Sequence, residues 1–98
     1  MKTPDQLQTA QDFLDFFEAI PEEKWCTTVY ENEDGQRCAE GHLIYAGGLT
    51  HNLVHKMEKL FPAHFSIIRV NDGVGAYNLP TPKQRICAAL RDAVAQGK

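Results

Sequence analysis

The stretch from residue 81 to residue 97 constrains the fold most, because it carries the sequence marks of an amphipathic helix. Thr81 supplies an N-cap hydroxyl, Pro82 suits the first helical position, and Gly97 is a natural stop. The apolar side chains recur at helical spacing on one face: Ile86, Ala89, Leu90, Ala93 and Val94. Because such a face must be covered by another element, the sequence predicts a domain of packed helices.

The N-terminal region repeats this pattern. Thr3 and Pro4 have the same capping character, and Gln6 completes a capping box. Apolar residues follow at helical spacing over a wide face: Leu7, Ala10, Phe13, Leu14, Phe16, Phe17 and Ile20. We expect one helix that starts at Pro4, and Pro21 either ends it or begins a short new turn through Lys24.

The middle of the chain mixes strand and helix signals. Residues 25–30 are β-branched and aromatic and precede Asp34-Gly35, a strong hairpin signal. The returning strand must be short, since residues 38–45 have the character of a helix that ends at Gly47-Gly48. A further helix is expected from about residue 50 to 60, and residues 65–70 fit either a strand or a short buried helix. The predicted fold class is α+β, mostly α, with four to five short helices packed around one small β-hairpin.

Length and composition agree with a single globular domain over residues 1–98. Apolar residues make up 43% of the chain and charged residues 23%. No stretch approaches the ~20 apolar residues of a membrane span, and the N-terminus lacks the pattern of a secretory signal. The three cysteines fit no disulfide framework, so we expect reduced thiols and a cytoplasmic protein without membrane association.

The charges divide unevenly along the chain. Residues 1–40 hold ten acidic and three basic side chains, and residues 41–98 hold three acidic and seven basic ones. Neither half has the concentrated Lys/Arg stripe of a nucleic-acid binder, so no nucleic-acid partner is expected. The asymmetry suits a protein partner or a homo-oligomer, although the two halves could also neutralise each other within one fold.

Cys38 is the first candidate for chemistry. It is predicted at the start of a helix, where the helix dipole favours a thiolate. With a nearby histidine such as His42 and with Asp72 as an orienting group, it could serve a thiol-dependent hydrolase or transferase. However, His42 would project away from the helix N-terminus, and the neighbouring Glu40 disfavours a thiolate. The alternative is a small, buried cysteine with a packing role.

Two pairs of residues have spacing that suits a metal. Cys38 and His42, and likewise His51 and His55, are each spaced i, i+4 on a predicted helix, so four ligands could hold zinc if the helices faced each other. Structural zinc sites usually contain close Cys pairs, which this chain lacks. Gly73-Val74-Gly75 lacks the further residues of a phosphate loop, so no cofactor is expected.

The order of the motifs resembles a small domain family of unknown function found in bacteria and phages. The resemblance is carried by Trp25, by Gly35-Gln36-Arg37-Cys38-Ala39-Glu40-Gly41-His42-Leu43, by Val70-Asn71-Asp72-Gly73 and by the C-terminal helix, and it spans residues 10–96. It implies a helical domain with a small hairpin and favours a helix at residues 65–70. It implies no activity.

The small side chains of Ala39 and Gly41 would let another backbone approach the start of their helix. We therefore expect Asn71 or Asp72 to cap the Cys38 helix or the adjoining turn. The favoured function is a small, non-enzymatic accessory or protein-interaction domain. The alternatives are the thiol-dependent enzyme built on Cys38 and a zinc-supported binding domain.

Overall fold

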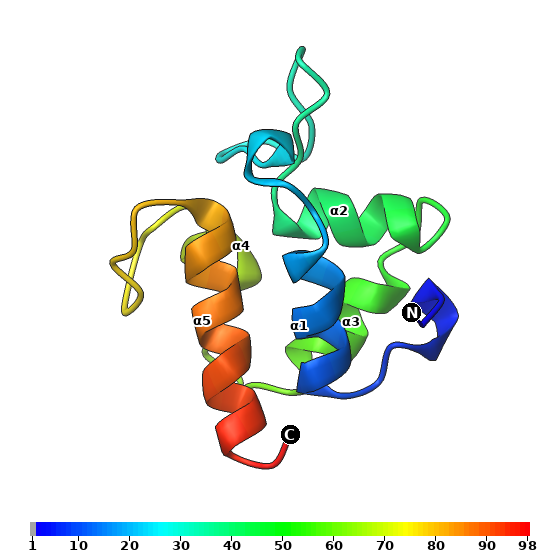
Figure 1. The fold of residues 1–98 in the computed structure, drawn as a ribbon, viewed down its shortest axis with the longest axis vertical. Coiled ribbons are helices and arrows are strands. Elements are labelled where there is room, and N and C mark those ends of the chain that lie inside the picture. Colours follow the sequence, from blue (N-terminus) through cyan, green and yellow to red (C-terminus); the bar gives the residue numbers. More distant parts are fainter. Residues whose placement is uncertain (1) are drawn as a thin grey trace.

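The structure, a computed structural model, describes residues 2–98. In chain order the elements are the 3-10 helix η1 (Pro4–Gln6), α1 (Ala10–Glu18), the 3-10 helix η2 (Glu22–Lys24), α2 (Ala39–Ala46), α3 (Asn52–Glu58), α4 (Ile67–Asn71) and α5 (Pro82–Ala95). Helices α1 and α5 lie side by side, and α2 crosses above α1 and α3 (Figure 1). The short α4 packs against both α5 and α2.

The core lies where these helices meet. Its fully buried large side chains come from every α-helix: Phe13, Phe17, Leu43, Met57, Ile67, Ile86 and Leu90. Trp25 closes the upper end of the core, with its ring tilted against Phe17 and its indole N–H donated to the Ile20 carbonyl at 3.3 Å. Burial of these faces supplies the main driving force for folding.

The predicted β-hairpin is wrong. The described residues contain no β-strand, and residues 25–38 form a loop that projects from the top of the molecule (Figure 1). The chain does reverse near Gly35, which has a φ of +76°. However, Arg37 makes only isolated bridges, one parallel to Trp25 and one antiparallel to Glu31. Thr28, with a φ of +69°, interrupts the extended run between them, so the fold class is helical rather than α+β.

The N-terminal helix begins later than its sequence predicts. Residues 4–6 form the separate helix η1, and Leu7 is extended with a ψ of 121°. The helix α1 starts after Thr9, whose hydroxyl accepts from the Asp12 amide, while Asp12 accepts from the amides of Gln8 and Thr9 at 3.0 Å. This second capping box, formed by Thr9 and Asp12, separates the two elements.

The other helical predictions are confirmed. Thr81 caps α5 through the Gln84 amide, and the chain forms α2 and breaks after Ala46. The short turn after Pro21 is η2. The open choice at residues 65–70 is settled by α4, which the Ser66 hydroxyl caps. No described helix has both the length and the apolar character needed to cross a membrane.

Candidate functional site

Cys38 occupies the N-cap position of α2, so its sequence placement at a helix start is confirmed. Its sulfur accepts a hydrogen bond from the Gly41 amide at 3.4 Å, and its side chain is 5% exposed. Burial raises the pKa of the Cys38 thiol, and this effect outweighs the Gly41 and Glu40 backbone amides, which lower the pKa. The thiolate that nucleophilic chemistry needs is therefore disfavoured in this position.

His42 lies one turn further along α2 and is occupied by another contact. Its Nε2 is 3.1 Å from the Lys24 carbonyl oxygen, and its ring packs edge-on against Trp25 at 5.1 Å between centroids. Burial lowers the pKa of His42 to about 4. The ring is thus neutral at pH 7, and it joins the end of η2 to α2 rather than contacting the Cys38 sulfur through a hydrogen bond.

The side chain of Asn71 joins three segments at the start of α2. Its Oδ1 accepts from the Ala39 amide at 2.9 Å, and its Nδ2 donates to the Cys26 carbonyl at 3.0 Å. Just before this point, the Arg37 amide donates to the Lys24 carbonyl at 2.9 Å, and the Cys26 amide donates to the Arg37 carbonyl at 3.0 Å. The Asn71 amide thus stands where the next ladder bond, from Ala39 to Cys26, would lie. The expected capping of the Cys38 helix by Asn71 is confirmed.

Asp72 acts on the adjoining turn, as expected. Its Oδ1 accepts from the Thr28 amide at 3.0 Å, which fixes the residue with the left-handed backbone conformation. Asp72 therefore holds the projecting loop against the end of α4. It also accepts from the Asn71 amide group, so the two side chains support one conformation.

Asn71 and Asp72 together join the projecting loop, α2 and α4, and we name this contact region the junction. Arg85 on α5 also stabilises the junction, and the sequence patterns did not identify this residue. Its guanidinium donates to the Asn71 carbonyl from Nε at 3.2 Å and from Nη2 at 2.7 Å, and to the Leu79 carbonyl at 2.8 Å. The side chain lies on α5, and its residue is 9% exposed. A basic residue in an amphipathic helix is usually solvated, so only the three-dimensional arrangement identifies this role.

Gly41 explains why α2 begins with small residues. A Cβ at this position would overlap the Tyr30 carbonyl oxygen, so the loop backbone rests directly on the helix. The same carbonyl accepts from the Cys38 amide at 3.3 Å. The expected close approach of a second backbone to Ala39 and Gly41 is therefore confirmed for Gly41.

The four residues considered as zinc ligands do not form one site. Cys38 and His42 are buried at the start of α2, whereas His51 and His55 lie at the exposed side of α3 with ring centroids 6.3 Å apart. His55 Nδ1 is 3.3 Å from the Glu58 carboxylate. Within residues 2–98, no three His, Cys, Asp or Glu side chains are grouped to hold a metal ion.

A groove of about 640 Å³ opens beside the junction, between the loop, α2 and α4. Its lining comprises Thr28, Val29, Tyr30, Glu31, Cys38, Tyr45, Ile68 and Asp72. Four of these are large apolar side chains that are 42–50% exposed: Val29, Tyr30, Tyr45 and Ile68. An exposed group of this kind is a recognised mark of an interaction surface. We name this feature the loop groove.

The sequence patterns do not predict the loop groove. The patterns place Val29 and Tyr30 in a strand, and they place Ile68 in a segment that fits either a strand or a short buried helix. Tyr45 lies on α2. Its hydroxyl donates a hydrogen bond to the Glu31 carboxylate at 3.1 Å, and the guanidinium carbon of Arg37 lies 3.5 Å from the centroid of its ring. The groove depends on contacts between loop and helix, which hydrophobic periodicity does not report.

Comparison of the chain with protein-family models, with curated proteins and with solved structures finds no match. The resemblance to the bacterial and phage domain family therefore stays a prediction from its motifs.

Proposed function

We propose that this protein is a non-enzymatic interaction module that binds a basic, apolar segment of a partner protein in the loop groove. The observation that carries the proposal is the cluster of four half-exposed apolar side chains around the groove. Tyrosine is enriched at protein interfaces, because its ring supplies a large rigid contact area and its hydroxyl a polar contact.

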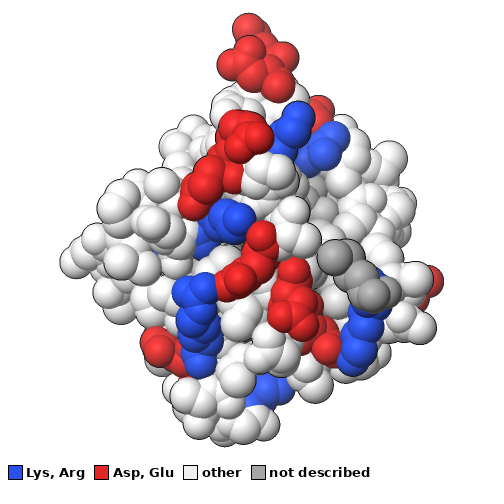
Figure 2. Space-filling model, viewed as in Figure 1, with Lys and Arg blue, Asp and Glu red and all other residues white. Residues whose placement is uncertain are grey.

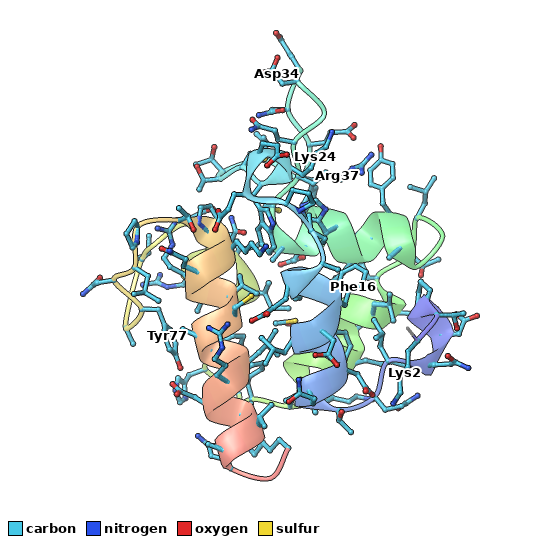
Figure 3. All side chains as sticks on the ribbon, in the orientation of Figure 1. Lys2, Phe16, Lys24, Asp34, Arg37 and Tyr77 are labelled. Carbon is cyan, nitrogen blue, oxygen red and sulfur yellow. The ribbon has the colours of Figure 1, made fainter. Side chains whose placement is uncertain are left out.

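Charge complementarity selects the partner. The two carboxylates in the lining, Glu31 and Asp72, face the groove without a Lys or Arg side chain in the lining. The projecting loop adds the exposed acids Glu33 and Asp34. Acidic side chains mark the tip of this loop in Figure 2, and Figure 3 labels Asp34 there. Arg37 lies beside the groove in an ion pair with Glu31. A segment with apolar side chains flanked by Lys or Arg would complement this surface.

The junction supports recognition by holding the groove in one shape. Asn71, Asp72 and Gly41 fix the loop on α2 and α4, so the loop loses little further freedom when a partner binds. The buried, hydrogen-bonded state of Cys38 and His42 argues for this structural role over a thiol-dependent reaction.

The test uses three short peptides added to isotope-labelled protein: one alternating Leu and Lys, one alternating Leu and Glu, and one alternating Ser and Lys. We expect the Leu/Lys peptide to shift amide resonances at residues 28–31, 45 and 68 more strongly than the other two. Ile68→Asp should abolish this binding. Leu79→Asp is the matched control, since Leu79 is equally exposed at 42% but lies outside the groove.

Equal binding of the Leu/Glu peptide, or unchanged binding by the Ile68→Asp variant, would overturn the proposal. Sedimentation tests whether a second copy of the chain occupies the loop groove. Self-association of the wild-type protein that Ile68→Asp removes, without any peptide binding, would identify a second copy of the chain in place of a basic partner.

A further inference from the structure

A second cleft, of about 350 Å³, lies on the other side of α4, between α4, α5 and residues 74–77. Its size falls within the range of small-molecule sites, about 300–1,000 Å³. It shares no lining residue with the loop groove, so it raises a separate question.

The cleft has an aromatic and aliphatic wall. The rings of Phe61 and Phe65 stack with centroids 3.7 Å apart and planes 8° from parallel. The wall continues with Val70 on α4 and with Ala89 and Ala93 on α5, whose small side chains leave space above the helix. A planar apolar group would fit against such a surface.

Arg69 supplies a cation at this cleft that the protein itself does not use. Each of the other three arginines has a partner: Arg37 pairs with Glu31, Arg91 with Glu18, and Arg85 binds the Asn71 carbonyl. Within residues 2–98, the guanidinium of Arg69 has no hydrogen bond or ion pair. Guanidinium groups bind carboxylates through two parallel hydrogen bonds.

The remaining carboxylate in the cleft is already engaged. The Tyr77 hydroxyl donates to Asp92 Oδ2 at 2.7 Å, and Tyr77, which lies between its loop and α5 (Figure 3), lines the cleft. Burial raises the pKa of Tyr77 to about 12, with a further contribution from Asp92, so the hydroxyl keeps its proton. Asp92 thus holds the loop in place, and Arg69 remains available to a ligand.

We propose that this cleft binds a small aromatic carboxylate, with its ring on the Phe61–Phe65 side and its carboxylate on Arg69. The shared chemistry, an aromatic ring with a carboxylate, could come from a simple aromatic acid or from an aromatic amino acid. The proposal is independent of the loop groove.

The probes are 3-phenylpropionate, the neutral 3-phenylpropanol and L-phenylalanine, each titrated while amide resonances and heat are recorded. We expect 3-phenylpropionate to shift resonances at residues 74–77 and 93 and to bind more tightly than 3-phenylpropanol. Titration of the wild-type protein distinguishes the two sources: tighter binding of 3-phenylpropionate indicates a simple aromatic acid, and tighter binding of L-phenylalanine indicates an aromatic amino acid.

Arg69→Gln should weaken carboxylate binding by about tenfold or more, the effect of losing a charge-assisted hydrogen bond. The matched control is Arg91→Gln, because Arg91 is an exposed arginine outside this cleft. An unchanged melting temperature shows that the Arg69→Gln variant is folded. The proposal fails if no probe binds, if 3-phenylpropanol binds as tightly as 3-phenylpropionate, or if Arg69→Gln binds as the wild type does.

Discussion

At the scale of single residues, Asn71 illustrates how one side chain replaces a missing backbone interaction. The Asn71 side chain accepts a hydrogen bond from the Ala39 amide and donates one to the Cys26 carbonyl, and Asn71 is 0% exposed. Asn71→Ala should leave both groups without partners and lower the free energy of unfolding by about 2–4 kcal/mol. Urea unfolding measures the loss, with the exposed Asn78→Ala as a control that should change little. Equal stability of the two variants would contradict this role.

Asp72 is more exposed than Asn71, so we expect it to contribute less to the free energy of unfolding. Asp72→Ala removes the acceptor for the Thr28 amide, and we expect a loss on the order of 1 kcal/mol, as for a removed helix cap. Asp72→Asn keeps a side-chain oxygen and should be closer to the wild type. Thermal melting compares the three proteins, and a curve unchanged by Asp72→Ala would remove the idea.

The three cysteines should differ in reactivity. Cys38 and Cys87 are buried, whereas Cys26 is partly exposed, and burial raises the pKa of all three thiols. We expect iodoacetamide at neutral pH to modify Cys26 before the other two, and Cys38 to react only as the protein unfolds. Mass spectrometry of timed digests locates the label. Rapid alkylation of Cys38 in the folded protein would revive the thiol-dependent enzyme.

At the scale of elements, the sequence predicted helices well where an apolar stripe and a cap agree, as in α5. It failed where a local signal was overruled by tertiary contacts. The chain does turn near Asp34-Gly35, but one residue earlier than predicted: the Gly35 amide donates to the Asn32 carbonyl at 3.1 Å, so the turn is centred on Glu33 and Asp34, and of the predicted pair only Gly35 has a positive φ. The strands beside it do not form, because Asn71 and Asp72 bind the backbone groups that a hairpin would pair. Those partners are more than 40 residues away along the chain.

The contact between the loop and α2 gives the sharpest prediction for an element. Gly41→Ala would ordinarily stabilise a helix by up to about 1 kcal/mol through its higher propensity. Here the added Cβ meets the rigid Tyr30 carbonyl, so we expect destabilisation and a displaced loop. Denaturant unfolding gives the sign, and Glu40→Ala in the same turn is the control. A stabilised Gly41→Ala protein would show that the loop does not rest on α2.

At the scale of the whole molecule, the loop groove forms because the loop packs on the helices where it closes the core. The helices α1 and α5 supply the largest contact, and the loop completes the core through Trp25. The sequence indicated that residues 35–43 and 71–72 belong together, through the small residues and the capping side chains. It could not indicate the two hollows, because each is lined by segments far apart in the chain and by residues that periodicity assigns elsewhere.

Two buried titratable groups should make the stability of the whole molecule depend on pH in separate ranges. The folded state lowers the pKa of His42 from 6.5 to about 4 through burial, so below pH 6.5 the unfolded chain takes up the proton first. Stability should therefore fall as the pH drops from about 6.5 to 4, by on the order of 3 kcal/mol at most. The hydrogen bond and charge of Lys2 and the Thr9 amide lower the pKa of Asp12, so its contribution is present above its ordinary pKa and is lost only in stronger acid. Urea unfolding at a series of pH values should show that His42→Gln removes the upper range, that Asp12→Asn removes the lower one, and that the exposed His55→Gln leaves both. A wild-type stability that is constant between pH 6.5 and 4 would contradict the buried, neutral state of His42.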